Sequence, residues 1–167
     1  MKHYIFRILK MAILLPLMPL FRLGDPSTSF RSFLMVSRDE GVTYEKVVDV
    51  KTTPDLGGPP ESVDCTTLSD GVFVSKPGIQ SMDSFEFLAN YTVEDYTRVQ
   101  ELARTPLDWS VWYGGTGAGP TVVPTGDLGK WNFRGELVSW PVGTSVNAIR
   151  DMNLTINAST EPEFVLI

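Results

Sequence analysis

The sequence predicts a mainly β protein in which antiparallel sheets pack as a β-sandwich and one flanking α-helix lies against them. Apolar and polar residues alternate in several stretches, most clearly at 82–91, 131–140 and 150–158, which is the pattern of strands with one buried face. Only residues 92–104 combine a helical period with end signals. A chain of 167 residues with 43% hydrophobic residues is long enough for one core of this kind.

The N-terminal part of the predicted domain is a hairpin. Residues 30–36 are expected to form its first strand and residues 42–50 its return strand, with the turn signal Arg-Asp-Glu-Gly at 38–41 between them. Residues 37–44 also fit the S-x-D-x-G-x-T-aromatic pattern of the Asp-box turns in sialidase propellers. Those turns occur as several repeats, whereas this chain has one copy, so we expect a plain hairpin turn.

A long stretch rich in turns follows. Residues 54–60, PDLGGPP, combine prolines that fix φ with glycines that permit positive φ, so they specify a path for the chain rather than a reactive site. A short extended piece at 61–67 and a long polar loop at 71–80 come next. Residues 82–91 then form a strand whose inner face is predicted to carry Phe85, Phe87, Ala89 and Tyr91.

The predicted helix covers residues 92–104. Thr92 is a natural N-cap, Asp95 stands where a capping box needs it, and Pro106 prevents the helix from continuing. One helix with one apolar face must lie on a sheet. The apolar stripe is predicted to consist of Val93, Tyr96, Val99 and Ala103.

The C-terminal half supplies strands at 107–113, 131–140 and 150–158. The connection at 114–130 is rich in Gly and Pro, but the G-x-G-x-x-G spacing fails and no helix follows, so a flexible loop is expected rather than a phosphate site. Trp109 and Trp131 fall on apolar strand faces and Trp112 and Trp140 on the opposite ones, where exposed aromatics often mark interfaces.

Composition excludes several classes of function. A net charge of −6 argues against gripping nucleic acid, because phosphate binding needs clustered Lys and Arg. The chain has one cysteine, Cys65, and one histidine, His3, which rules out a Cys/His zinc site. No carboxylate pair sits in a setting that would separate two pKa values. We therefore predict no catalytic, metal-binding or cofactor-binding residue and no cofactor.

Residues 1–29 are read as an N-terminal arm or extension that precedes the domain at 30–167. Residues 1–21 are basic and then apolar, as in a secretory signal peptide, but Pro16 and Pro19 interrupt the apolar run. An arm that buries its apolar side chains on a neighbouring subunit is the second interpretation. A natural start at Met11, with the first ten residues as an upstream extension, is the third.

The polar faces of the best strands form a broad, hydrophilic, mildly acidic surface. Such a surface is either an ordinary solvated sheet face or the wall of a channel for DNA, which would stay wet and repel the phosphate backbone. Its members are Glu86, Glu136, Asp151, Asn153, Thr155 and Asn157.

One resemblance covers most of the chain. The run PDLGGPPESVDCTTLSD at 54–70 resembles the signature of major tail tube proteins of long, flexible-tailed (siphovirus-type) bacteriophages. The match continues in order through PGIQ at 77–80, FEF at 85–87, the helix, WNFRG at 131–135 and residues 146–156. It extends roughly from residue 30 to residue 163.

The resemblance implies a structural virion protein and not an enzyme. It implies a β-sandwich of the tail-tube type with long assembly loops, whose hexameric rings stack into a hollow tube. This tube would enclose a tape measure protein, meet tail terminator and baseplate proteins, and conduct DNA during genome ejection without sequence-specific binding. The protein would be made in the host cytoplasm and would not enter a membrane.

On this resemblance, the six polar strand residues become candidates for the lumen of the tube. The turn at 54–60 and the loop at 71–80 become candidates for contacts between subunits and rings. The contact candidates are Pro54, Leu56, Pro59, Val72, Phe73, Val74, Pro77 and Ile79. The alternative is a secreted β-sandwich module that binds carbohydrate or protein through its exposed tryptophans, with residues 1–21 as its signal peptide.

Overall fold

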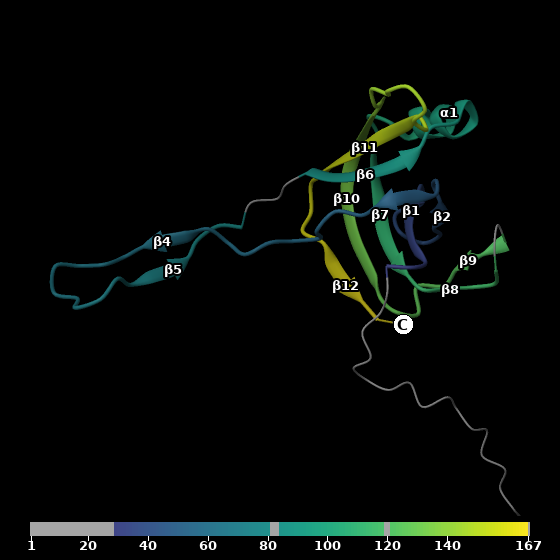
Figure 1. The fold of residues 1–167 in the computed structure, drawn as a ribbon. Coiled ribbons are helices and arrows are strands. Elements are labelled where there is room, and N and C mark those ends of the chain that lie inside the picture. Colours follow the sequence, from purple (N-terminus) through teal and green to yellow (C-terminus); the bar gives the residue numbers. More distant parts are fainter. Residues whose placement is uncertain (1–28, 81–83, 119–120, 167) are drawn as a thin grey trace, which may run out of the picture.

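The computed structural model describes residues 29–80, 84–118 and 121–166. The predicted N-terminal extension, residues 1–29, therefore lies outside the described residues apart from its last residue. The main sheet of the described part is antiparallel throughout (Figure 1). Its strands run, in spatial order, β2 (Glu45–Lys46), β1 (Ser32–Ser37), β7 (Pro106–Tyr113), β10 (Lys130–Pro141), β11 (Asp151–Ala158), β6 (Ser84–Asn90) and β3 (Val50–Thr52), and β12 (Glu163–Val165) pairs with the start of β10.

This sheet curls so that its two halves pack on each other as a sandwich around one core. The rings of Phe85 on β6 and Phe133 on β10 meet edge to face, 4.8 Å between centroids. Trp109 on β7 is fully buried, and its indole nitrogen donates a 3.0 Å hydrogen bond to the carbonyl of Gly135. The strand register places every predicted inner residue of 131–137 and 152–156 on this core side, as the alternation predicts.

Helix α1 (Val93–Leu102) covers one end of the sandwich (Figure 1). Thr92 caps it as predicted, accepting a 3.1 Å hydrogen bond from the Asp95 backbone. The predicted stripe is wrong in part: Val93 is 73% exposed, Ala103 is the C-cap, and the buried residues are Val99 and Leu102. Directly after α1, Ala103 forms an isolated β-bridge with Leu137 on β10, and the Arg104 backbone N–H donates to the Leu137 carbonyl. The C-terminal half of the helix therefore faces the core and its first turn does not.

The predicted return strand at 42–50 is present only in part. Only Glu45 and Lys46 pair with β1, and the chain then crosses to the other end of the sheet, where β3 pairs with β6. Val47 and Val48 are consecutive and both buried, which fits a segment that crosses between sheet ends rather than a strand with one buried face.

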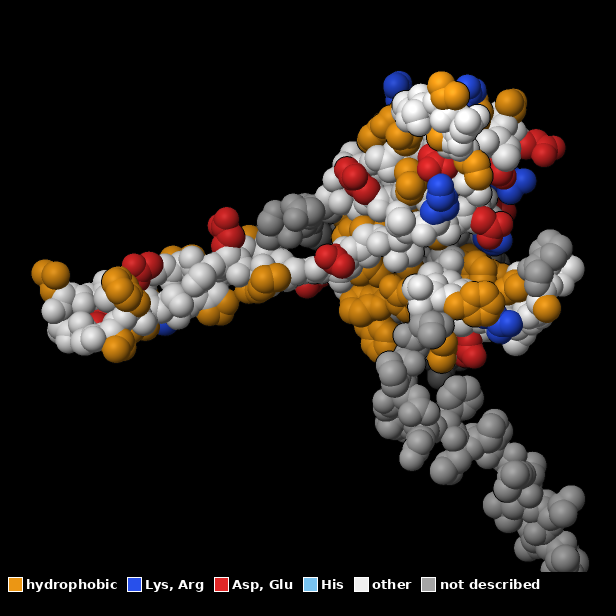
Figure 2. Space-filling model, viewed as in Figure 1, with side chains coloured by type: hydrophobic (Ala, Val, Ile, Leu, Met, Phe, Trp, Pro, Cys, Tyr) orange, Lys and Arg blue, Asp and Glu red, His pale blue; other side chains and the backbone are white. Residues whose placement is uncertain are grey.

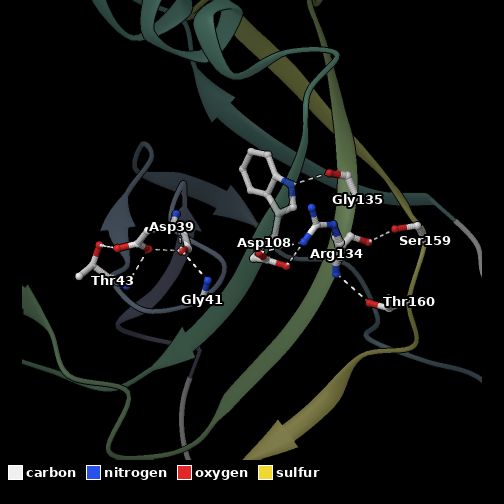
Figure 3. A network of polar contacts seen from close by, with 10 residues as sticks. Asp39, Gly41, Thr43, Asp108, Arg134, Gly135, Ser159 and Thr160 are labelled. Atoms are coloured by element: carbon white, nitrogen blue, oxygen red, sulfur yellow. Dashed lines mark hydrogen bonds and ion pairs between the residues drawn. The ribbon is translucent and has the colours of Figure 1, made fainter.

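The turn before β2 is held by side chains (Figure 3). The Asp39 carboxylate accepts hydrogen bonds from the Thr43 backbone and hydroxyl at 2.8 and 2.5 Å, and from the Ser37 hydroxyl at 2.7 Å. Ser37 also accepts one from the Gly41 backbone. The Ser, Asp, Gly and Thr of the sequence pattern thus build this single turn together.

The segment at 114–130 contains more structure than a flexible loop. Its short strands β8 (Gly115–Thr116) and β9 (Val123–Pro124) pair with each other. Gly114 begins the segment with φ +98°, and a Cβ there would lie 1.9 Å from the Asp127 carboxylate, so glycine is required. This small hairpin lies on the side of the sandwich away from β4 and β5 (Figure 1).

The turn-rich stretch forms a projecting hairpin, here called the arm and defined as residues 54–80. Its strands β4 (Ser62–Asp64) and β5 (Ser75–Pro77) pair only with each other among the described strands. The arm extends well away from the sandwich (Figure 1). Among the described residues, the arm is the segment that lies farthest outside the compact sandwich (Figure 1).

Candidate functional site

The described residues contain none of the side-chain clusters that metal chemistry needs: no group of three or more His, Cys, Asp or Glu could hold a metal ion. No helix in the same residues is long and apolar enough to cross a membrane. The candidate functional features are therefore surfaces, namely the polar face of the main sheet and the arm.

The polar face runs across three neighbouring strands, β10, β11 and β6, because the register aligns their outward residues in rows. Glu136 on β10 lies opposite Asn157 on β11, which in turn lies opposite Ser84 on β6. In the next row Thr155 lies between Val138 and Glu86. All six predicted polar strand residues therefore share one face of the sheet.

The exposure of these six side chains differs. Glu86, Glu136 and Asn157 are exposed, whereas Asp151 and Asn153 are half-buried. Thr155 is only 8% exposed, and no described residue bonds its hydroxyl oxygen. Glu86, Glu136 and Asn157 are thus the members that present a polar group freely to the space outside the subunit.

Strand β7 extends this face, which the sequence reasoning missed. The Ser110 hydroxyl on β7 donates a 2.5 Å hydrogen bond to the Asn132 side chain on β10. Asp108 pairs with Arg134 at 3.3 Å across the same two strands (Figure 3). The alternation of Pro106–Tyr113 puts Asp108 and Ser110 on the same side of the strand as Trp112 and so carries this signal, although Ser110 itself is fully buried.

The charges of the face are partly neutralised within the subunit. Asp108 is bound to Arg134, and Asp151 is bound to Lys51 at 2.8 Å. The carboxylates of Glu86 and Glu136 take part in no ion pair of the described residues. Lys130 at the start of β10 also forms no ion pair of the described residues and lies over the Trp112 ring. The two free carboxylates outnumber this one cation, so the net free charge that β6, β10 and β11 present on this face is negative.

One end of the face is apolar. The row that contains Asn153 is flanked by Trp140, which is 43% exposed, and by half-buried Leu88. Val138 precedes it on β10 and is also exposed. A sheet face with a polar middle and an apolar end offers both a wetted surface and a place for packing.

Of the two tryptophans predicted on outward faces, Trp112 is covered. The Tyr44 ring lies 5.7 Å from it, and the Lys130 ammonium lies 3.7 Å from its centroid in a cation–π contact. Trp140 alone remains well exposed. A tryptophan platform for sugar stacking therefore lacks its second member.

The arm is shaped by polar side chains at its tip. The Asp64 carboxylate accepts hydrogen bonds from the hydroxyl and backbone of Thr66, which lower its pKa. Asp70 accepts from the backbone and hydroxyl of Thr67, which lowers its pKa likewise. Both acidic groups stay ionised at neutral pH and accept local hydrogen bonds that favour the turns at the tip.

The apolar side chains of the arm have almost no cover within the subunit. Phe73 is 92% exposed and Ile79 is 90% exposed. Figure 2 shows hydrophobic side chains distributed along the arm with acidic ones between them. The exposed large apolar residues of the arm are Val63, Leu68, Val72, Phe73, Val74 and Ile79.

The predicted contact residues of the arm divide into two groups. Leu56 is half-buried and packs against the core of its own subunit, and Pro54 is half-buried at the root. Pro59 and Pro77 are exposed, as are the apolar residues at the tip. Leu56 therefore anchors the arm, while the outer residues are available to another chain.

No family model matches this sequence, and no curated protein is significantly similar to it. Solved structures do share its fold. A chain of the sheath–tube complex of the extracellular contractile injection system PVC, in the extended state, superposes with a TM-score of 0.61 at 12% identity, covering 87% of this chain and 95% of that one.

Two further structures agree. A chain of the PVC sheath/tube terminator has a TM-score of 0.58 at 12% identity and covers 86% of this chain and 99% of that one. A chain of the baseplate of the anti-feeding prophage, six-fold symmetrised, has a TM-score of 0.61 at 9% identity and covers 86% and 98%. At these identities the likeness establishes the fold, a β-sandwich of the tail-tube type.

Proposed function

We propose that this chain is the subunit of the hollow tube of a phage tail. Copies form hexameric rings, the rings stack, and the tube encloses a tape measure protein and conducts DNA. The observation that carries the proposal is a fold shared over at least 86% of this chain with chains of tail-like particles, joined to an arm whose apolar side chains are uncovered.

Exposed apolar residues give the arm a physical reason to bind another copy. Fully burying a Leu, Ile, Val or Phe side chain stabilises a complex by about 1.5–3 kcal/mol. The arm leaves six large apolar side chains uncovered by its own chain, so their burial against another copy would add up to a substantial gain. Phe73, Val72 and Leu68 at the tip are therefore the contacts that we propose between subunits and rings.

The polar sheet face is the proposed lumen. DNA must pass a tube wall without sticking, and binding of phosphates requires Lys and Arg that release counterions. The free carboxylates of this face, Glu86 and Glu136, repel phosphates instead. Asn157 keeps the wall wet between them.

We infer a six-fold ring and a sheathless, flexible tail from two different sources. The six-fold arrangement is supported by the symmetry of the anti-feeding prophage baseplate, whose chain has this fold. The flexible tail is supported by the residue-level resemblance at 54–70 and 131–135.

The solved neighbours belong to contractile systems, so mass spectrometry of intact particles decides whether the tail has a sheath. Absence of a sheath protein at a copy number similar to that of this chain supports the flexible tail.

Assembly is tested with the purified full chain. We expect rings or tubes in negative-stain electron micrographs as the protein is concentrated, because arm burial gains free energy with each added copy. A chain that stays monomeric at all concentrations, both alone and with tape measure protein, contradicts the proposed function.

A further inference from the structure

An open groove of about 620 Å³ lies between β3 and the start of β1. Phe33 and Val50 contribute apolar surface to it, and Arg31, Lys46 and Lys51 contribute positive charge. One carboxylate, Asp49, is also part of its lining. The lining of the groove therefore combines apolar surface with a net positive charge.

The groove follows a free sheet edge. Strand β3 ends the main sheet and pairs only with β6 among the described strands. A free edge presents unpaired backbone N–H and C=O groups, which are a template for a further strand. Addition of an extended segment to such an edge is a common mode of recognition.

We propose that this groove binds strand β4 of a second copy of the chain, which adds to the free edge of β3. The inference rests on the proposed function and deepens it, since it assigns the surface that receives the arm. In Figure 1 the chain's own β4 lies far from the sandwich, so the occupant must come from another copy.

Charge selects the arm over the chain's own N-terminal segment. The arm carries four carboxylates and one cation: Asp55, Glu61, Asp64, Asp70 and Lys76. Residues 1–28 have the opposite balance, with Lys2, His3, Arg7, Lys10, Arg22 and Asp25. A groove lined by Arg31, Lys46 and Lys51 attracts the first segment and repels the second.

Within the arm, β4 is better suited than β5. Strand β4 consists of Ser62, Val63 and Asp64, each of which has a backbone N–H, and Glu61 precedes it. Strand β5 contains Lys76, which carries the wrong charge, and Pro77, which cannot donate to a ladder. Val63 is exposed and meets the apolar surface of the groove when β4 is seated there.

One of the two ion pairs in the groove permits this exchange readily. Lys46 is bound to exposed Asp49 at 2.5 Å, and a pair of this kind contributes little to stability, so Lys46 can turn toward a carboxylate of an incoming strand at small cost. Lys51 is bound at 2.8 Å to half-buried Asp151, so it contributes to the positive charge of the groove while it keeps that partner.

Cys65 provides a direct test, because it is exposed and follows β4 immediately. The native full chain is labelled at Cys65 with benzophenone maleimide, mixed with an equal amount of ¹⁵N-labelled unmodified protein, concentrated and irradiated. We expect mass spectrometry to find cross-links between the two isotopic forms, concentrated in residues 29–33 and 46–53. Cross-links that map elsewhere, or that stay within one copy, overturn the inference.

The cross-linking result separates this inference from the proposed function. Tubes with cross-links outside the groove leave the tube function standing and remove the groove as receptor. Cross-links to the groove without rings or tubes support the docking and contradict the tube. Absence of any cross-link between copies overturns the docking in either case.

Charge reversal supplies an independent measurement on the same contact. Lys46→Glu with Lys51→Glu should reduce the yield of groove cross-links at least about tenfold, and Asp55→Lys with Glu61→Lys should do the same. Combining the four changes should restore the yield, because the pairing is re-established with opposite signs. Arg104→Glu with Arg150→Glu, two exposed residues that do not line the groove, is the matched control. Failure of the combination to restore any yield overturns the inference.

Discussion

Asp39 organises the turn that follows β1. Its carboxylate accepts hydrogen bonds from Thr43, through both hydroxyl and backbone, and from the Ser37 hydroxyl (Figure 3). These bonds, with the Thr43 hydroxyl contributing most, lower the pKa of Asp39 to about 2. A side chain that the sequence places in a turn motif is thus a structural anchor and not a reactive group.

The lowered pKa of Asp39 gives a prediction about acid stability. Folding favours the ionised form, so this group stabilises the fold above its ordinary pKa of 3.8 and loses that contribution as the pH falls toward about 2. We expect Asp39→Asn to lower Tm at neutral pH and to flatten the dependence of Tm on pH in this window. Thermal melts of dilute protein across this pH range measure Tm for both proteins.

Asp55→Asn is the control for that experiment, because the Asp55 carboxylate takes part in none of the hydrogen bonds and ion pairs of the described residues. Its melting curve should follow that of the unsubstituted protein across the same pH range. Equal Tm values for Asp39→Asn and Asp55→Asn at neutral pH would contradict the role given to Asp39.

Among the elements, the long strands were predictable because alternation with a period of two is a local signal. It placed Phe85, Phe87, Leu154 and Ile156 in the core and Glu136 on the opposite face, and the register agrees. The polar face of β7 was available from the same signal. Alternation within a strand does not specify the order of strands in the sheet, so it does not predict which polar faces lie side by side.

Elements that depend on tertiary packing were not predictable. The consecutive buried residues Val47 and Val48 belong to a crossing between sheet ends, and neither β2 nor β3 is long enough to show a period. Strand β12 pairs with the start of β10, where the tilted rings of Phe164 and Trp131 lie 5.2 Å apart between centroids. The buried side of α1 depends on where its last turn meets Leu137, which no helical period specifies.

The arm gives the prediction that belongs to the scale of elements. Deleting residues 71–80 removes Phe73, Val72 and Ile79, which make almost no contact with the sandwich. We expect the deletion to abolish polymerisation while the free energy of unfolding of the sandwich changes by no more than about 1 kcal/mol. Electron microscopy and urea unfolding measure the two quantities.

A matched variant of another loop completes that experiment. Replacing residues 143–149, which connect β10 to β11 and do not line the groove, by a short Gly-Ser turn shortens a different loop and leaves the arm intact. If the variant lacking 71–80 still forms normal tubes, the assembly role of the arm is wrong.

At the scale of the whole molecule, free carboxylates and basic side chains lie on two different surfaces. The polar sheet face presents Glu86 and Glu136 as free carboxylates, whereas the groove beside β3 is lined by Lys46, Lys51 and Arg31. In the proposed tube, the first surface faces passing DNA and the second faces another subunit. The net charge of −6 is compatible with both.

Reversing the charge of the sheet face tests its proposed place in the lumen. Glu86→Lys with Glu136→Lys should leave tube assembly unchanged, since both side chains are exposed, but should make the channel retain DNA. Phage carrying these changes should eject DNA more slowly, and the defect should weaken as salt rises. Glu94→Lys with Glu101→Lys on α1 is the control, and equal ejection rates for both pairs would contradict a lumen at this face.

A cryo-electron microscopy map of the assembled tube tests the central claim most directly. The account predicts stacked rings of this chain around an open channel, with the faces of β6, β10 and β11 that carry Glu86, Glu136 and Asn157 lining that channel. A map that places these three residues on the outer surface, or that shows no continuous channel, would contradict it.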